Sequence, residues 1–418
     1  MTKTAVVAGG GIAGTVAAIA LHRAGFTPLI HEAHDRGADE SGAFVTVAVN
    51  GLAALRALGL DPARVFAAGF PTPTMELRNS AGRRLAALPL GGPLADGTTT
   101  TTIRRADLYL ALRAEAEHRG IKIAYGRRLT GIAKRPGGVT ALFSGDDAVD
   151  ADLLVGADGL HSRTRAALDP AAPAPRYLGL LNAGGFTSGP VAASPVAASP
   201  VAASPVAASP VAASPVAAGL APEPGVMQMA FGRRAFFGWA TAPDGAVWWF
   251  ANPPRKLPAE PGEWTPAGWR AYLLELFADD AVPAAALIRA TDEILGPWNT
   301  WDLPRVPVWR DDRTVLIGDA AHAVSPSSGQ GASMAIEDAV TLGRCLSARA
   351  DVPAALADYE RLRRDRVEKV VAYGRRNGST KTAGPVGAAF RDALIPLAMR
   401  LLYRKGDPQA WILDHRVG

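Results

Sequence analysis

The chain of 418 residues is long enough for two domains and a large buried core, and its contents of 48% hydrophobic and 20% charged residues are ordinary for a soluble globular protein. The single cysteine, Cys345, excludes a disulfide framework and a cysteine-based metal site; it is expected to be a small core residue, and a reducing cytoplasm fits this usage. The formal charge is +5, but the sequence contains no nucleic-acid motif, so nucleic acid is not an expected partner. No apolar run reaches membrane-spanning length and the first strand leaves no room for a signal peptide, so stable membrane association is not expected either.

Residues 4–32 contain the pattern of a dinucleotide-binding turn. A short apolar run leads into Gly9-x-Gly11-x-x-Gly14, an alanine-rich segment follows, and a second apolar run ends at Glu32. This order predicts a strand, a tight turn, a helix and a second strand. It is the context in which the glycine spacing indicates a Rossmann-like unit.

The glycines of this turn have separate roles. Gly9 permits the tight turn, Gly11 lets the backbone approach a pyrophosphate, and Gly14 lets helix and strand pack closely. The helix start offers free N–H groups and the positive end of its dipole to phosphates. A carboxylate at Glu32 can accept hydrogen bonds from ribose hydroxyls and would repel a 2′-phosphate, so the site is predicted to suit FAD or NAD, not NADP.

Two later stretches also suggest ligand-binding turns. Residues 98–103 predict a strand that leads into a helix; Arg105, near the helix start, either meets a phosphate or ribityl chain or lies at the surface. Residues 151–165 predict a buried strand, a Gly-Ala-Asp-Gly turn and a helix start, where Asp158 can accept hydrogen bonds from backbone amides and hydroxyls.

A further strand is predicted to end at Gly318-Asp319, at the usual ligand edge of an α/β sheet. A Gly/Pro loop at 326–331 precedes a helix at 332–346, whose N-terminus would favour negative charge on a bound ring system. His322 has no partner in the nearby sequence and is expected to be structural.

The middle of the chain contains a low-complexity segment. From residue 190 to 218 it reads PVAAS five times and then PVAA. A proline at every fifth residue forbids a continuous helix or a central strand, and Ala, Val and Ser offer too little bulk for a core. An extended, mobile insert is therefore expected, with docking of a partner as the non-enzymatic alternative.

Residues 75–90 and 225–252 predict antiparallel hairpins, the second rich in aromatic residues. One face of this second hairpin should pack on the core, and the other is a candidate pocket for a flat organic ligand. Phe237, Trp239 and Trp249 are the pocket candidates, with a purely core role as an equal alternative.

Three more helices are predicted at 264–277, 354–376 and 386–403, the last kinked at Pro396. The arginine-rich run at 361–366 is expected to be a solvated helix face. The last helix has two interpretations. Its basic residues would suit a membrane surface, but packing against the body of the protein is favoured; these residues are Arg391, Arg400, Arg404 and Lys405.

Three of these segments together resemble the single-component FAD-dependent aromatic monooxygenases related to p-hydroxybenzoate hydroxylase. The signatures are the Gly9–Gly14 turn with Glu32, Val155-Gly-Ala-Asp-Gly159 with Ser162 and Arg165, and Gly318-Asp-Ala-Ala-His322 with Pro326 and Gly329-Gln-Gly331. Their order and separations match over nearly the whole chain. The resemblance implies an α/β fold: a Rossmann-like FAD-binding domain, an inserted antiparallel-sheet substrate domain and C-terminal helices.

The expected division gives residues 1–72, 98–172 and 303–360 to the FAD-binding domain, 73–97 and 173–302 to the substrate domain, and 361–418 to a C-terminal helical region. Three features depart from the family pattern. Ser333 stands where asparagine is frequent, the 190–218 insert lies inside the substrate domain, and the loop at 36–44 lacks the arginine often found before its glycine.

The resemblance also implies the cofactor contacts. The glycine turn, with Ile12 and Ala13, holds the FAD diphosphate and Glu32 the adenosine ribose; Arg105 contacts FAD, and Asp158 shapes a turn that serves both FAD and NAD(P)H. Gly318 and Asp319 meet the ribityl chain. The loop facing the isoalloxazine contributes Pro326, Gly329, Gln330, Gly331, Ala332 and Ser333, and no catalytic base is identified.

The implied activity is hydroxylation of an aromatic or polycyclic small molecule of the kind found in secondary metabolism. NAD(P)H reduces the flavin, O2 adds to give a flavin C4a-hydroperoxide, and one oxygen passes to the substrate. Because only one dinucleotide fingerprint is present, NAD(P)H must bind transiently. Three alternatives to hydroxylation stay open: epoxidation, Baeyer–Villiger insertion, and the activity of a reductase or dehydrogenase of the same fold. The sequence also does not decide between NADH and NADPH or between a monomer and a homodimer. The Trp-x-Trp-x-Ile-Pro run of flavin-dependent halogenases is absent.

Overall fold

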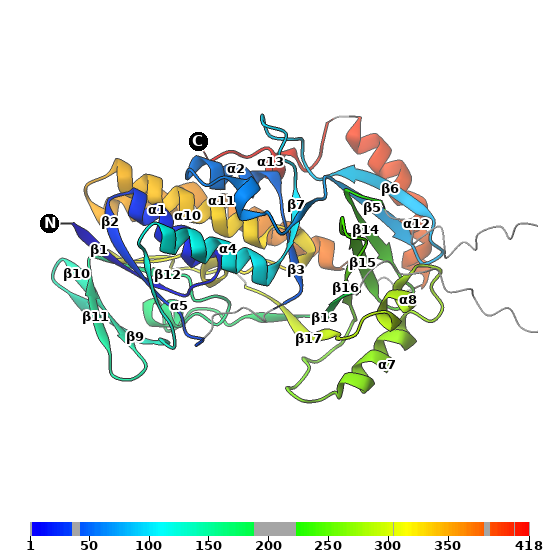
Figure 1. The fold of residues 1–418 in the computed structure, drawn as a ribbon, viewed down its shortest axis with the longest axis horizontal. Helices are drawn as coiled ribbons and strands as arrows, with labels where there is room; N and C mark the ends of the chain where they lie inside the picture. Colours follow the sequence, from blue (N-terminus) through cyan, green and yellow to red (C-terminus); the bar gives the residue numbers. More distant parts are fainter. Residues whose placement is uncertain are drawn as a thin grey trace, which may run out of the picture.

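The computed structural model describes residues 2–35, 42–187, 223–303, 305–379, 385–404 and 406–417. A parallel sheet with its helices occupies one half of the described chain, and a larger sheet with its own helices occupies the other (Figure 1). The repeat at 190–218 and most of the loop at 36–44 lie outside the described residues.

The parallel sheet has five strands in the order β18-β12-β1-β2-β8, and every neighbouring pair is parallel. The predicted strand–turn–helix–strand unit is confirmed as β1 (Lys3–Ala8), α1 (Ile12–Arg23) and β2 (Phe26–His31). The other strands are β8 (Lys122–Ala124), β12 (Leu153–Gly156) and β18 (Thr314–Leu316). Since parallel strands end at one edge, the turns after β1, β12 and β18 are neighbours there.

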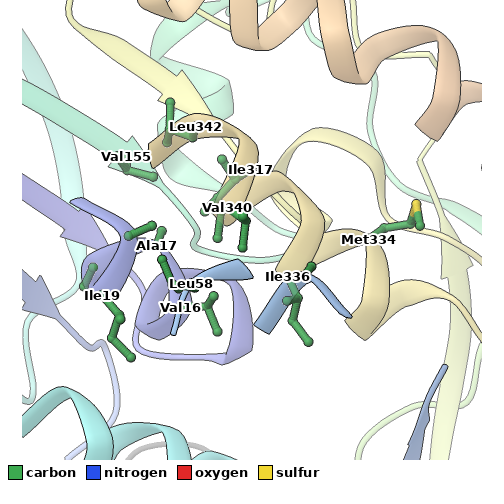
Figure 2. Packing of buried hydrophobic residues seen from close by; sticks show 14 of the residues in the cluster. Val16, Ala17, Ile19, Leu58, Val155, Ile317, Met334, Ile336, Val340 and Leu342 are labelled. Carbon is green, nitrogen blue, oxygen red and sulfur yellow. The ribbon is translucent and has the colours of Figure 1, made fainter. Parts of the chain in front are cut away.

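Helix α1 packs closely against α10 (Gly331–Ala348). Small residues make this approach possible: a Cβ at Gly343 would lie only 2.7 Å from the Cβ of Ala20. Cys345 is buried in the same region, as predicted. Figure 2 shows apolar side chains of both helices in one cluster, among them Val16, Ala17, Ile19, Ile336, Val340 and Leu342.

Further helices and a small sheet complete this half. The helices that add to the same apolar cluster are α2 (Val49–Ala57), α3 (Pro62–Val65), α4 (Arg105–His118), α9 (Asp319–His322), α11 (Val352–Ser379) and α13 (Ala410–Leu413). Helix α5 (Arg163–Leu168) follows β12. An antiparallel sheet of order β3-β7-β4 lies between the two halves, with strands β3 (Phe44–Val47), β4 (Phe70–Pro71) and β7 (Thr101–Arg104).

A three-stranded antiparallel sheet packs on the parallel sheet. Its strands are β9 (Leu129–Arg135), β10 (Gly138–Phe143) and β11 (Ala148–Ala151). Val139, Ala141 and Phe143 of β10 meet Val6 and Leu154 of the parallel sheet.

His31 is buried in this packing without a hydrogen-bond partner for either ring nitrogen among the described residues. Its ring stacks on Phe143 with the centroids 4.0 Å apart. Burial, and secondarily Arg127, lower the pKa of His31 from 6.5 to about 4. The imidazole is therefore neutral at pH 7.

This histidine should make the fold sensitive to mild acid. Between pH 6.5 and about 4 the unfolded state binds a proton at His31 that the folded state does not, so stability present above pH 6.5 is lost as the pH falls through this window. The loss is up to ~3 kcal/mol. We expect His31→Phe to remove this part of the pH dependence when free energies of unfolding in urea are compared at neutral pH and about pH 4. His118→Phe, at an exposed position, should keep it, and an equal drop in both variants would refute the assignment.

The larger sheet has seven strands in the order β17-β13-β16-β15-β14-β5-β6. Its strands are β5 (Thr74–Asn79), β6 (Arg84–Pro89), β13 (Arg176–Phe186), β14 (Val226–Phe231), β15 (Phe236–Thr241), β16 (Val247–Asn252) and β17 (Leu295–Asp302). Both predicted hairpins are confirmed. The sequence did not indicate that β5 pairs parallel with β14, which joins the two hairpins into one sheet.

The two faces of this sheet have different surroundings because side chains alternate along each strand. Helices α7 (Pro266–Leu276) and α8 (Ala284–Arg289) cover one face and form a separate apolar cluster with it. The other face carries aromatic and methionine side chains that pack with Phe44 of β3 and Phe70 of β4.

Helix α12 (Pro385–Tyr403) lies across β6 at the far edge of the same sheet (Figure 1). Its Ile395 packs on a cluster that includes Leu85 and Phe231, so the predicted packing against the body is confirmed for this side of the helix. None of the described helices is both long and apolar enough to cross a membrane.

Candidate cofactor site

The turns after β1, β12 and β18 are joined at the carboxyl edge of the parallel sheet. The N–H of Gly9 donates to the carbonyl of His31 at 2.8 Å, that of Ala157 to Ala8 at 2.8 Å, and that of Ile317 to Gly156 at 3.0 Å. The structure thus brings the three predicted glycine–carboxylate turns onto adjacent strands.

The three glycines of the first turn differ in what surrounds them. Gly9 has a φ of 106°, which favours glycine, and its Cβ would lie 2.4 Å from the Ala157 carbonyl oxygen. A Cβ at Gly14 would lie 1.9 Å from the Gly9 carbonyl oxygen. No described atom lies within 4 Å of a Cβ at Gly11. Close contacts with the backbone therefore require glycine at positions 9 and 14, whereas Gly11 faces open space.

The N-terminus of α1 opens on this space. Gly11 is the N-cap and no described side chain bonds there, nor does the first turn contain an acidic residue. Helix geometry leaves the first N–H groups without partners, and the dipole adds positive charge. This end of α1 can hold an anion such as a diphosphate.

Glu32 lies beside the glycine turn and is only 6% exposed. Its Oε2 accepts the Gly10 N–H at 2.7 Å, and its Oε1 accepts from the backbone and ring nitrogens of His34 at 2.9 and 2.8 Å. Burial raises the pKa of Glu32, but the bonds from His34 and Gly10 lower it by more. The carboxylate is ionised, and Oε2 keeps a lone pair for a further donor such as a ribose hydroxyl.

Asp158 holds the turn after β12. It accepts from the Ser162 hydroxyl at 2.5 Å and from the N–H and hydroxyl of Thr164 at 2.9 and 3.0 Å, which confirms the predicted amide and hydroxyl donors. Arg165 donates to the carbonyls of Leu160 and Ala320 at 2.7 and 2.9 Å. This buried arginine therefore connects the turn after β12 to the turn after β18.

Asp319 and Arg105 come from distant parts of the sequence, and their charges interact. Asp319 is exposed while the rest of α9 is buried. Arg105 donates to the Tyr109 hydroxyl at 2.7 Å. Burial lowers the pKa of Arg105, but Tyr109 and, more weakly, Asp319 raise it by more, so the guanidinium stays protonated.

A second uncapped helix start faces open space at α10. The loop contains a 3-10 turn (Pro326–Ser328) and Gly329 in the left-handed region. No described atom lies within 4 Å of a Cβ at Gly329 or Gly331, and no described side chain caps the helix. Ser333 is turned away: it is fully buried, and its hydroxyl accepts the Ala48 N–H at 3.2 Å.

A buried ionic network that the sequence did not reveal lies behind this helix start. Glu337 and Asp338 are fully buried on α10, and Arg363 of α11 donates to both, at 2.5 and 2.7 Å. Asp338 also accepts the Gly318 N–H at 2.9 Å and contacts His322 Nε2 at 2.5 Å. The network therefore fixes the turn that carries Asp319.

This network corrects two predictions made from the sequence. The arginine-rich run at 361–366 is not simply a solvated face, because Arg363 is 1% exposed and Arg366 binds Glu337 at 2.8 Å. His322 is structural as expected, but it has a partner, Asp338, on the next long helix. The available signal was the pair Glu337-Asp338 inside an apolar helix, since buried carboxylates require cations.

The same network reaches the loop before α10 through Asn50 of α2. Its Nδ2 donates to Glu337 at 2.7 Å and to Oε1 of Gln330 at 3.1 Å. Gln330 is 4% exposed, so its side chain is held inside the protein at the α10 N-terminus.

Comparison with known proteins places the chain in a family. Residues 1–373 match the family model described as FAD binding domain. The chain is 32% identical over 378 residues to the aurachin C monooxygenase/isomerase of Stigmatella aurantiaca, covering 90% of this chain and 88% of that protein. The chain belongs to the FAD-dependent aromatic monooxygenases.

Other relatives of this flavoprotein support the same family and fold. It is 32% identical over 418 residues to the 3-amino-4-hydroxybenzoate 2-monooxygenase PtmB3 of Streptomyces platensis, covering 97% of this chain and 94% of that one. The crystal structure of Klebsiella pneumoniae HpxO complexed with FAD and uric acid has a TM-score of 0.77 and 25% identity, covering 96% and 95% of the two chains. A salicylate hydroxylase substrate complex, with a TM-score of 0.73 and 22% identity over 100% and 99% of the chains, shows the same fold. The predicted α/β fold and the FAD cofactor are confirmed.

The recess of the flavoprotein fits FAD. The open space before Gly11 matches a diphosphate, Glu32 can accept from a ribose, and the open space at Gly329 and Gly331 lies at a second helix N-terminus.

The aromatic residues of the larger sheet divide between its faces. Phe237, Trp239 and Trp249 are at most 4% exposed and belong to the cluster under α7 and α8, and Trp249 Nε1 donates to Thr291 at 2.8 Å. This placement favours the core alternative that the sequence left open.

The opposite face is lined by the neighbouring positions of the same strands. Phe186 and Phe250 are partly exposed there, and the Phe44 ring contacts Phe186, Trp248 and Phe250 with centroids 6.4, 5.9 and 6.0 Å apart. The Arg104 guanidinium lies 4.6 Å from the Phe186 ring centroid and 5.3 Å from that of Trp248. Strand β3 connects this aromatic face to the start of α10, because Phe44 packs on the face and the Ala48 N–H, just after the strand, bonds Ser333 of α10.

Proposed function

We propose that this flavoprotein uses NAD(P)H and O2 to hydroxylate an aromatic or polycyclic small molecule. The observation that carries the proposal is the recess between the two uncapped helix starts, α1 and α10, which adjoins an aromatic sheet face. Relatives named as monooxygenases of 3-amino-4-hydroxybenzoate and 6-hydroxynicotinate support an aromatic substrate.

The proposal assigns the cofactor contacts as follows. The turn from Gly9 to Gly14 binds the diphosphate, Glu32 the adenosine ribose, and Arg105 and Asp319 the ribityl linker. Asp158 keeps the neighbouring turn in shape. The isoalloxazine lies against the segment that contains Pro326, Gly329, Gln330, Gly331 and Ala332.

Bound FAD supplies the redox chemistry, accepting a hydride from NAD(P)H and activating O2 for transfer of one oxygen atom. The chain supplies the surroundings. The N-terminus of α10 favours negative charge on the ring, and the network through Asn50 holds Gln330 in place beside it. The aromatic face keeps water away from the reacting carbon.

We place the substrate on the face of Phe186, Trp248 and Phe250 rather than on that of Phe237. Phe250→Leu should raise the KM for an aromatic substrate about threefold to tenfold through loss of ring contacts, while the FAD content stays unchanged. Phe237→Leu is the matched change on the opposite face; it should lower stability by about 1 kcal/mol and leave KM unchanged. A larger KM effect from Phe237→Leu would contradict this placement.

The activity is tested by screening aromatic compounds for stimulated NAD(P)H oxidation. Coupled oxygen uptake and a product heavier by one oxygen atom are the expected results, with NADH and NADPH compared side by side. Turnover that continues under nitrogen with another electron acceptor, and never adds oxygen to a product, would support a reductase or dehydrogenase instead.

A further inference from the structure

The outward face of α12 is a continuous apolar stripe. Phe390, Leu394, Leu397 and Leu401 recur at intervals of four, three and four residues, the spacing that places side chains on one side of a helix. These four side chains are 52–64% exposed. Leucine and phenylalanine are costly to leave in water in such a row, so the stripe points to a binding surface.

The inward face of α12 is already occupied. Ile395 packs on the sheet, the Arg391 guanidinium lies 4.3 Å from the Phe231 ring centroid, and Arg83 donates to the Asp392 carbonyl at 3.1 Å. The helix therefore cannot roll to bury its stripe without giving up these contacts. The partner of the stripe must approach from outside the described body.

The charges next to the stripe are positive. Arg400 and Arg404 are exposed along one of its edges. Asp392 is the only acidic residue between 385 and 404, and its carboxylate is bonded to Arg391 at 2.8 Å. An apolar stripe with cations at its edge matches the interface of a membrane that contains anionic lipids.

We propose that α12 lies flat on an anionic lipid surface, with the stripe in the acyl boundary and Arg400 and Arg404 at the headgroups. A helix of 19 residues is about 28 Å long, enough for all the stripe residues to insert together. A second copy of the chain is a poorer occupant, because it would bring two more exposed arginines to a helix whose one carboxylate, Asp392, is already paired with Arg391. No helix in the described chain meets the requirements for crossing a bilayer, so the attachment is peripheral.

The test is flotation of the full-length holoenzyme with phosphatidylcholine vesicles, with and without phosphatidylglycerol. We expect binding to the mixed vesicles that weakens as salt is added. Leu394→Asn with Leu397→Asn should reduce the partition coefficient about tenfold or more, and Arg400→Gln with Arg404→Gln about tenfold on mixed vesicles only.

The matched control is Leu257→Asn with Leu362→Asn, which removes two leucines elsewhere that are 71% and 53% exposed and should leave partitioning unchanged. FAD content and NAD(P)H oxidation in solution should be the same in all three double variants, which separates this inference from the proposed activity. Absence of vesicle binding by the unaltered protein would overturn the inference. So would sedimentation as a dimer that the Leu394→Asn, Leu397→Asn pair dissociates without any vesicle binding, since the stripe would then be a contact between copies.

Discussion

Arg363→Met is expected to lower the free energy of unfolding by about 3–5 kcal/mol, because it leaves two buried carboxylates without their shared cation. Methionine nearly fills the same volume, so the cost is electrostatic rather than a cavity. Burial would raise the pKa of Asp338, but His322 and Arg363 hold it at about 2. Without the guanidinium, Asp338 keeps only His322 and the Gly318 N–H, and Glu337 keeps Arg366 and Asn50, so each buried carboxylate loses one ion pair.

Arg361→Met provides the control on the same helix. Arg361 is 69% exposed and pairs with Asp358 at the surface, so its loss should cost about 0.5 kcal/mol or less. Urea unfolding of both variants, with and without added FAD, measures the difference. Similar costs for the two substitutions would show that the buried network contributes little to stability.

The second large effect is expected on cofactor affinity. Gly11→Glu should give a folded protein that is purified without FAD, because the new carboxylate occupies the open space before α1 that we propose as the diphosphate site. Two like charges 4 Å apart repel by about 4 kcal/mol at an effective dielectric constant near 20, which corresponds to roughly a thousandfold loss of affinity. The apoprotein should tolerate the change, since the position is open and acidic residues suit a helix N-terminus.

Two further glycine variants make this result interpretable. Gly11→Ala adds a Cβ that meets no described atom and should keep most of the flavin. Gly14→Ala would force a Cβ into the Gly9 carbonyl and should impair folding itself. Visible absorbance and the melting temperature of the apoprotein are measured for each, and a fully yellow Gly11→Glu protein would exclude the proposed diphosphate site.

The features that the sequence predicted are those set by neighbours along the chain. The glycine turn, the strand at β12 and the donors to Asp158 lie within a few residues of one another, so their spacing specifies the geometry. The same holds for the hairpin of β15 and β16. Backbone pattern and local hydrogen bonding were sufficient for these elements.

The features that it missed depend on distant partners. No local pattern pairs Asp338 with Arg363, and Ser333 is turned away from the recess only because α2 offers the Ala48 N–H. The choice between the faces of Phe237 and Phe250 was also open, because alternation shows that a strand has two faces without showing what covers each.

The parallel pairing of β5 with β14 has a consequence for biosynthesis. The β5–β6 hairpin emerges from the ribosome long before β14 exists, and until then one backbone edge of β5 is a template for pairing with other nascent chains. β5 carries Glu76 and Arg78, bonded to each other at 2.8 Å. Because charged side chains on a strand edge disfavour pairing with other chains, we expect Glu76 and Arg78 to reduce misassembly until β14 has been translated.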